Sequence, residues 1–206
     1  MQSAFLWERE GLYVDPLGIP ADAPKARAVF ITHAHPDHFS LADIKRVMTP
    51  DTLFVVPLDV ADTLQGEVGR MIVVSPGDAI EAVGLSVDAV PAYNVQPRTN
   101  HPKEKNWVGY VIAVDGVRYY HAGDTDLIPE MGPISCDVAM LPIGGTFTMD
   151  VKEAAEAARV LNPKIVVPMH YGYFAGTAGD AKALAEALKD VPVAQLEPVV
   201  PFRNPS

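Results

Sequence analysis

Residues 31–40 read Ile31-Thr32-His33-Ala34-His35-Pro36-Asp37-His38-Phe39-Ser40, which places three of the six histidines and one carboxylate within six positions. The cluster follows the nearly all-apolar segment Ala28-Val29-Phe30-Ile31, so it lies where a buried strand is expected to end. His33 and His35 are two residues apart in extended chain, so both imidazoles project to the same side. They can therefore bind one cation, and Zn²⁺ accepts such nitrogens at about 2.0–2.1 Å.

Asp37 and His38 follow Pro36, which breaks the strand and turns them in another direction. We expect them to hold a second ion beside the first. The alternatives are a surface turn with coincidental histidines and a mononuclear structural site. We favour shared cations, because a buried strand gains nothing from ending in four ionisable groups that no ion brings together.

Two later strand ends carry the same kinds of side chain. Tyr120-His121-Ala122-Gly123-Asp124-Thr125-Asp126 ends an apolar strand in a glycine-bounded turn, where Asp124 can present a carboxylate to both ions. Pro168-Met169-His170-Tyr171-Gly172 ends another apolar strand and offers one more imidazole at His170. Three apolar strands that end in metal-ligand residues predict a site at one edge of a sheet.

The composition is typical of one globular domain that spans residues 1–206, with 49% hydrophobic and 20% charged residues. The 16 basic residues against 26 acidic residues give a net charge of -10, which disfavours binding to nucleic acid. Cys136 is the single cysteine, so no intrachain disulfide is expected. The N-terminal residues show no signal-peptide pattern, and no apolar run reaches the ~18 residues of a membrane span. We therefore expect a cytoplasmic protein with no membrane partner.

Proline and glycine, 19 and 15 residues, cut the sequence into short apolar pieces of strand length. The predicted strands are Ala4–Glu8, Leu12–Val14, Ala26–Thr32, Leu53–Val56, Met71–Val74, Leu85–Pro91, Val108–Val114, Val117–His121, Val138–Leu141, Ile165–Pro168 and Val193–Gln195. Asp115-Gly116 predicts a type I′ hairpin turn. Helices are predicted from a sequence resembling a capping box at Ser40–Asp43, from Asp150 to Leu161, and from about Gly179 to Lys189. Helices between strands predict a mixed α/β fold with helices covering sheet faces.

The sequence resembles the metallo-β-lactamase superfamily, whose signature His-x-His-x-Asp-His appears here as His33, His35, Asp37 and His38. The resemblance covers nearly the whole chain. It implies a four-layer αββα sandwich with a dinuclear site at one edge of the two sheets. It also implies that His33 and His35 bind the first metal ion and that Asp37 and His38 bind the second.

The later motifs come in the order that this family shows. The resemblance implies that Asp124 bridges the two ions and that His170 binds the second. The segments Val14-Asp15-Pro16, His121–Asp126 and Leu141–Asp150 are similar to the branch that contains L-ascorbate-6-phosphate lactonase and related small Zn-dependent hydrolases.

The sequence departs from the family pattern at the third ligand of the first metal ion. Related chains place a histidine soon after a Pro-Ala pair, but Pro91-Ala92-Tyr93 is followed here by Asn94. The histidine available before the Asp124 turn is His101, in the polar connection from Asn94 to Asn106. We favour His101 as the third ligand, and Asn94 as an oxygen ligand or substrate contact is the alternative.

Several neighbours of these motifs have two interpretations. His121 is predicted to hydrogen-bond and orient a carboxylate rather than to bind metal. Asp15 is either a turn residue or, by the resemblance, a carboxylate that fixes the tautomer of His33 or His35. Tyr171 is a candidate proton donor or oxyanion partner.

Other polar residues are weaker candidates for contact with a substrate. The loop cations Arg98, Lys103 and Lys105 either neutralise an anionic group of the substrate or form a solvated surface. Gly144-Gly145-Thr146 is either an anion-binding turn or, as we favour, a tight turn.

These residues predict a metal-dependent hydrolase with two divalent ions per chain. Zn is favoured, and Mn, Fe and Ni also accept mixed His/Asp ligands. Two ions roughly 3.5–4 Å apart share a water whose pKa falls toward about 7, which supplies a bridging hydroxide to attack an ester, lactone or phosphodiester bond of a small molecule. Asp124 and Asp37 are the candidate catalytic carboxylates, together with Tyr171.

The sequence also bears on three other functions. An RNA-processing nuclease is disfavoured by the net charge of -10. A flavodiiron redox enzyme would need Glu at the position of His35. A non-catalytic or mononuclear metal-binding module of the same fold stays open because of the irregularity at Asn94 and His101. The resemblance is also compatible with a homo-oligomer.

Overall fold

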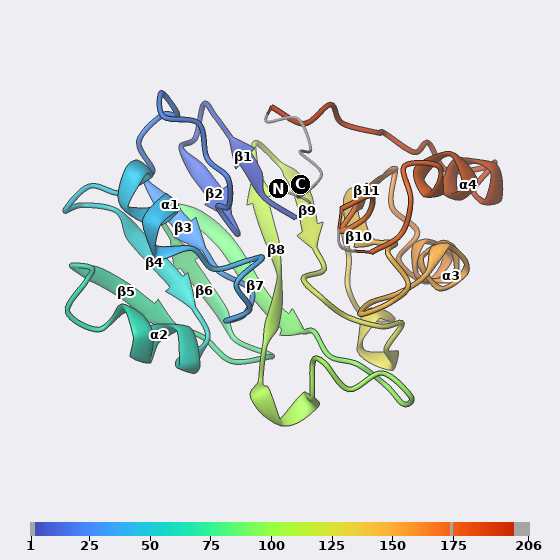
Figure 1. Ribbon diagram of the computed structural model, residues 1–206, viewed down its shortest axis with the longest axis horizontal. Coiled ribbons are helices and arrows are strands. Elements are labelled where there is room, and N and C mark those ends of the chain that lie inside the picture. Colours follow the sequence, from blue (N-terminus) through green and yellow to red (C-terminus); the bar gives the residue numbers. More distant parts are fainter. Residues whose placement is uncertain (1–2, 174, 200–206) are drawn as a thin grey trace.

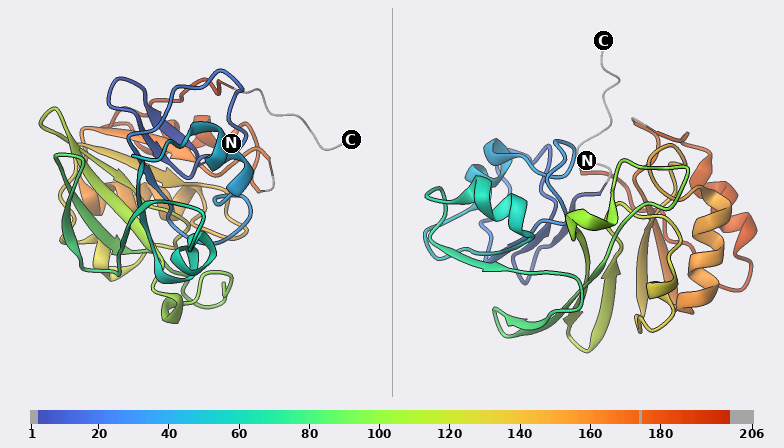
Figure 2. Two further views of the ribbon diagram at one scale, coloured as in Figure 1. Left: turned by 90° about the vertical axis from the view of Figure 1, so that its left-hand side faces the viewer. Right: turned by 90° about the horizontal axis from the view of Figure 1, so that it is seen from below.

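Two stacked β-sheets carry helices on their outer faces in the computed structural model, which describes residues 3–173 and 175–199 (Figure 1). The predicted single domain also includes residues 1–2, 174 and 200–206, which lie outside the described residues. Viewed from below, the order of layers is helices, sheet, sheet, helices (Figure 2). The predicted four-layer αββα sandwich is confirmed.

The first sheet has the strand order β1-β2-β3-β4-β5. Its strands are β1 (Phe5–Trp7), β2 (Leu12–Val14), β3 (Ala28–Phe30), β4 (Leu53–Val56) and β5 (Arg70–Val73). β1 pairs antiparallel with β2, and the other neighbours are parallel. The outer face carries α1 (Leu41–Val47) and α2 (Leu58–Leu64). Both faces are covered, which is why the sequence of β2 to β4 is apolar almost without interruption.

The second sheet has the strand order β11-β10-β9-β8-β7-β6. Its strands are β6 (Ala79–Ala82), β7 (Leu85–Pro91), β8 (Val108–Val114), β9 (Val117–His121), β10 (Val138–Pro142) and β11 (Ile165–Met169). The predicted Asp115-Gly116 hairpin joins β8 to β9, and both residues have the positive φ of a type I′ turn, 51° and 77°. The outer face carries α3 (Val151–Leu161) and α4 (Asp180–Ala187).

Side chains alternate between two apolar layers along each central strand. In β3, Ala28 and Phe30 pack between the two sheets, whereas Val29 packs under α1 and α2. Tyr110 of β8 lies between the sheets, and its hydroxyl donates to the carbonyl oxygens of Ile31 and Val55 at 2.8 and 3.0 Å. This phenol joins the two sheets directly beneath the turn that carries the histidine cluster.

Some local predictions are wrong. The helix α2 and the strand β6 were not predicted, and Val193 forms only an isolated bridge to Val166 where a strand was expected. α1 has no reciprocal capping box: Ser40 accepts from the N–H of Asp43, but the Asp43 carboxylate accepts from the N–H groups of Gly18 and Ile19 instead.

α3 begins with a complete capping box formed by Asp150 and Glu153. The short 3₁₀ turns are η1 (Lys103–Lys105) and η2 (Pro129–Met131). Within the described part of the chain, no helix combines the length and the apolar character that a bilayer span requires.

Candidate metal centre

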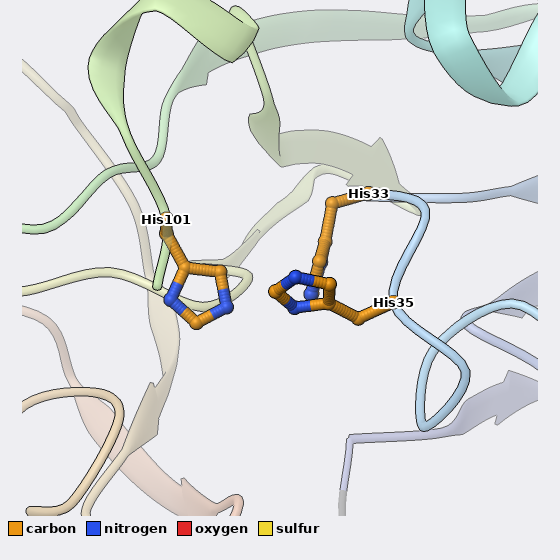
Figure 3. Close-up of side chains that lie close together, drawn as sticks. All are labelled: His33, His35 and His101. Carbon is orange, nitrogen blue, oxygen red and sulfur yellow. The ribbon is translucent and has the colours of Figure 1, made fainter. Parts of the chain in front are cut away.

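Four segments that are far apart in the sequence meet at one edge of the two sheets. The segment after β3 carries His33, His35, Asp37 and His38, and the turn after β9 carries Asp124. His170 follows β11 with φ 54°, which turns the chain sharply at the end of the strand. His101 comes from the long connection between β7 and β8. In Figure 3 its ring lies opposite those of His33 and His35.

The structure brings all seven predicted ligands together in two groups. The ligand atoms of His33, His35 and His101 lie within 4.8 Å of one another, and we call this group the histidine subsite. The second group, the carboxylate subsite, has ligand atoms equally close together and comprises Asp37, His38, Asp124 and His170.

Asp124 lies between the two subsites. Its Oδ2 atom is 3.2 Å from Nε2 of His101 and 3.9 Å from Nε2 of His33, both in the histidine subsite. The same oxygen is 3.0 Å from Nε2 of His170, and Oδ1 is 3.2 Å from Nε2 of His38. This placement suits a carboxylate that is shared by two cations.

The buried ligand atoms fit divalent metal ions. His33, His38, His101 and His170 are at most 2% exposed. Their Nε2 atoms, together with Oδ1 of Asp124, have no hydrogen-bond partner among the residues that the structure describes. Leaving such atoms unpaired in the interior is costly. Histidine nitrogens and carboxylate oxygens are the donor set of Zn²⁺ and related ions, so a pair of cations would satisfy these atoms.

The charges differ between the subsites. Burial lowers the pKa of His33, and the neighbouring His38 adds to this effect. Although burial opposes protonation, the Asp124 carboxylate holds the pKa of His38 well above its usual value and raises that of His170 to about 9. Against the effect of burial, His38 and His170 hold the pKa of Asp124 well below its usual value. The carboxylate subsite therefore has the stronger attraction for positive charge.

Asp15 supports ligands in both subsites. It is fully buried at φ 47°, and its Oδ1 accepts from the N–H of Thr32 at 2.8 Å. Its Oδ2 accepts from the Thr32 hydroxyl and is bonded to Nδ1 of His38, each at 2.7 Å. Thr32 Oγ1 is in turn 2.9 Å from Nδ1 of His33. Of the two interpretations of Asp15, the structure favours an orienting carboxylate, which acts directly on His38 and through Thr32 on His33.

Among the residues that the structure describes, His121 hydrogen-bonds no carboxylate, so that part of its prediction is wrong. Its Nε2 is 2.9 Å from the carbonyl oxygen of Ser3, which accepts the hydrogen bond, and its Nδ1 accepts from the N–H of Gly123 at 3.2 Å. The buried ring therefore ties the start of the chain to the turn that presents Asp124.

Asn94 contacts the site through His101. Its Oδ1 accepts from the backbone N–H of His101 at 2.8 Å and is 3.1 Å from Nδ1 of the same residue. Both lone pairs of this oxygen are therefore engaged, which disfavours Asn94 as an oxygen ligand.

Two of the loop cations already have protein partners. Arg98 donates to both carboxylate oxygens of Glu153 at 3.0 and 2.8 Å, and to Oδ1 of Asp126 at 3.1 Å. Lys103 forms an ion pair with Glu130 at 2.7 Å. Lys105 lies with Nζ 5.8 Å from the centre of the Trp107 ring.

Trp107 was missed by the sequence analysis. Its buried ring lies 5.0, 4.8 and 5.7 Å from the rings of His33, His35 and His101, so it forms a wall of the histidine subsite. Its Nε1 donates to Asp59 of α2 at 2.8 Å. No local motif marks this tryptophan, because its role depends on packing against His33 and His35, which lie more than 70 positions earlier.

Gly144 and Tyr171 lie beside His170. A Cβ atom on Gly144 would collide with the His170 carbonyl oxygen, and Gly145, at φ 76°, donates its N–H to Met149 at 3.0 Å. The Gly-Gly segment is therefore a tight turn. Burial raises the pKa of Tyr171. A hydrogen bond with the Gln195 side chain lowers this pKa, and the charge of Glu197 raises it. The role of Tyr171 as a proton donor stays a prediction.

Comparison with known proteins identifies similar sequences and structures. A family model described as a β-lactamase superfamily domain matches residues 1–170. A UPF0173 metal-dependent hydrolase from Thermococcus onnurineus is 36% identical over 194 residues, which cover 87% of this chain and 85% of that protein. One from Thermococcus kodakarensis is 34% identical over 204 residues, covering 91% of this chain and 89% of that protein.

Solved structures agree with these sequence comparisons. A protein from Parabacteroides distasonis, described as a metal-dependent hydrolase, superposes with a TM-score of 0.81 at 34% identity, covering 93% of this chain and 87% of that chain. Igni18, a metallo hydrolase from Ignicoccus hospitalis, superposes with a TM-score of 0.76 at 29% identity, covering 96% and 92%. The narrower resemblance to L-ascorbate-6-phosphate lactonase stays a prediction.

Proposed function

The chain belongs to the β-lactamase superfamily and is a metal-dependent hydrolase, and we propose that it hydrolyses an ester, lactone or phosphodiester bond of a small molecule at a dinuclear centre. In this proposal His33, His35 and His101 hold one ion, and the carboxylate subsite holds the other. Zn²⁺ is the ion that we propose, because four of the seven donors are buried imidazoles.

One observation carries the proposal. Four buried Nε2 atoms and a buried carboxylate oxygen converge without hydrogen-bond partners among the described residues. Orienting partners stand behind three of the imidazoles: Thr32 bonds Nδ1 of His33, Asp15 bonds Nδ1 of His38, and Asn94 bonds Nδ1 of His101. Such partners are typical of metal-bound histidines.

Two bound divalent ions would supply hydroxide at neutral pH and a Lewis acid for the oxygen of the scissile bond. The protein contributes the orientation of the donors and control over protons. We assign to Asp124 the orientation of the nucleophile, because its carboxylate lies within 3.2 Å of ligand nitrogens of both subsites. Asp37 has a side chain that is 31% exposed, whereas those of Asp124 and His170 are 3% exposed. Asp37 is therefore the carboxylate placed to exchange protons with solvent water, and Tyr171 is the proposed donor to the leaving group.

The proposed substrate is small. Arg98 and Lys103 are neutralised by protein carboxylates, which leaves Lys105 as the loop cation proposed to contact an anionic substrate. The net charge of -10 supports a function without nucleic acid. We also propose a cytoplasmic location, from the sequence, and a homo-oligomeric state, with which the resemblance to the family branch is compatible.

Metal content and turnover test the proposal together. We would purify the full chain without chelator, reconstitute it with excess Zn²⁺ or Mn²⁺, desalt it, and measure metal per chain by mass spectrometry. The same samples would be assayed with a p-nitrophenyl ester, a lactone and bis(p-nitrophenyl) phosphate, before and after treatment with a chelator. We expect close to two ions per chain and turnover of at least one substrate that is lost on chelation. One ion per chain with turnover would replace the dinuclear mechanism by a mononuclear one. Two ions without turnover of any substrate class would favour the non-catalytic module.

A further inference from the structure

His101 differs from the other ligands because it lies on a long connection rather than directly after a strand. The connection leaves β7 at Pro91 and returns to β8 at Val108, yet the side chain of His101 is only 2% exposed. Hydrogen bonds made by residues of the connection must therefore position this ring, because no strand pairing does so.

Asn94 hydrogen-bonds this connection to two other segments of the chain. Its Nδ2 donates to Oδ1 of Asp126 at 3.1 Å and to the carbonyl oxygen of Phe147 at 2.9 Å. Its Oδ1 receives the backbone N–H of His101 at 2.8 Å. A flipped amide would place oxygen against the oxygens of Asp126 and Phe147, so the orientation of the Asn94 side chain is determined.

This orientation determines the tautomer of His101. The Asn94 oxygen can only accept, so Nδ1 of His101, 3.1 Å away, must carry the proton. In the neutral ring Nε2 then presents a lone pair, and it lies 3.2 Å from Oδ2 of Asp124. Two atoms that both present lone pairs repel one another at this distance unless a proton or a metal ion lies between them.

Charged side chains around Asn94 hold its amide group in place. Asp126 accepts from Asn94 and from Arg98 through Oδ1, and from the N–H of Val95 through Oδ2 at 2.8 Å. Arg98 binds both oxygens of Glu153 in the first turn of α3. These hydrogen bonds link the connection to α3, which packs on the outer face of the second sheet.

The partner of His101 is neutral, unlike the partner of His38. Nδ1 of His38 is bonded to the Asp15 carboxylate at 2.7 Å. A carboxylate partner raises the basicity of an imidazole ligand more than an amide does. The histidine subsite also contains no carboxylate of its own apart from the shared Asp124, as far as the described residues go.

Building on the proposed dinuclear function, we propose that Asn94 is a positioning residue that fixes His101 for metal binding through Nε2, and that the histidine subsite, which has no carboxylate of its own and a neutral amide behind His101, holds its ion more weakly than the carboxylate subsite. This subsite loses its ion first when metal is limiting. Asn94 does not itself contact the ion.

Asn94→Leu tests the proposal, because leucine is similar in size but makes no hydrogen bond. Lys103→Met is the matched control, since it removes an ion pair from the same connection but leaves Asn94 in place. Zn²⁺ affinities would be measured by competition with a chromophoric chelator. We expect Asn94→Leu to lower the affinity for the more weakly held ion by about 10- to 100-fold and to leave the affinity for the other ion unchanged. Lys103→Met should bind both ions as the wild type does.

A spectroscopic measurement on the wild type covers the case in which Asn94→Leu does not fold. Nitrogen NMR of ¹⁵N-histidine-labelled, Zn²⁺-loaded protein should show His101 with a proton on Nδ1 and metal on Nε2, the signal being assigned by its absence in His101→Gln. Coordination through Nδ1, or unchanged affinity for both ions in Asn94→Leu, would overturn the inference. If the wild type itself binds fewer than two ions, the dinuclear proposal fails instead, so the two failures are distinguishable.

Discussion

Replacing Asp15 by Asn isolates the effect of one buried charge on the metal centre. The Asp15 side chain is fully buried, and it bonds the N–H of Thr32, the hydroxyl of Thr32 and Nδ1 of His38 at 2.8, 2.7 and 2.7 Å. Asn is nearly isosteric, and it tolerates the left-handed backbone at φ 47° better than most residues. The substitution therefore changes the charge and one acceptor and leaves the shape almost unaltered.

The expected loss follows from these contacts. In Asp15→Asn the amide oxygen of the new side chain can still accept from the N–H of Thr32, but its NH₂ group then faces Nδ1 of His38. The hydrogen bond between His38 and a charged acceptor is lost, which costs about 1.5–3 kcal/mol of folding free energy. His38 also loses the partner that keeps its proton on Nδ1, so affinity for the ion of the carboxylate subsite should fall about 10- to 100-fold.

Two assays check this reasoning. Urea unfolding of the metal-free protein gives the loss of stability, and chelator competition gives the metal affinity. Asp62→Asn serves as the control, because this exposed aspartate of α2 undergoes the same chemical change far from the site. If Asp15→Asn kept the stability and both metal affinities of the wild type, Asp15 would not be the orienting carboxylate that the structure indicates.

Three further perturbations address other parts of the molecule. Burial raises the pKa of the Cys136 thiol from 9.0 to about 11. Alkylation by iodoacetamide at pH 8 should therefore be about 100-fold slower in the folded protein than in urea, and its rate should increase tenfold per pH unit. Equal rates in the folded and unfolded protein would show that the thiol is accessible and has an ordinary pKa. His101→Ala should reduce the metal content from about two ions to about one, and retention of two would exclude His101 as a ligand. In Gly109→Ala the new Cβ would meet the carbonyl oxygens of His121 and Ala122 at 2.6 and 2.7 Å, so we expect a loss of about 1–3 kcal/mol in urea unfolding. An unchanged free energy of unfolding in Gly109→Ala would argue against the clash.

Short-range signals in the sequence were sufficient for much of the fold. Strands buried on both faces, such as β3 and β4, appear as continuous apolar runs, and Asp115-Gly116 allows few backbone conformations. α2 and β6 escaped prediction because their signals are weak. α2 has no side-chain cap and leaves Leu58 65% exposed, and β6 is a partly exposed edge strand of four residues.

The types of ligand were readable from the sequence because strand ends concentrate them. His33, His35 and His38 are neighbours in the chain, and the turns at Asp124 and His170 each follow an apolar strand. When parallel strands of packed sheets end at the same edge, side chains just beyond those ends must meet. Chain connectivity and strand direction therefore implied the meeting point before any side chain was placed.

The partners behind those ligands depended on the folded arrangement. Asp15 bonds His38 rather than His35, His121 bonds Gly123 and Ser3, and Asn94 bonds His101 instead of serving as a ligand. Each contact depends on the direction in which a turn or loop residue points, which the packing of distant segments determines. A sequence pattern carries the identity and periodicity of donors, whereas the hydrogen bond that selects a tautomer requires two side chains to be aligned within a few tenths of an ångström. That alignment exists only after both sheets and the 94–106 connection have packed together.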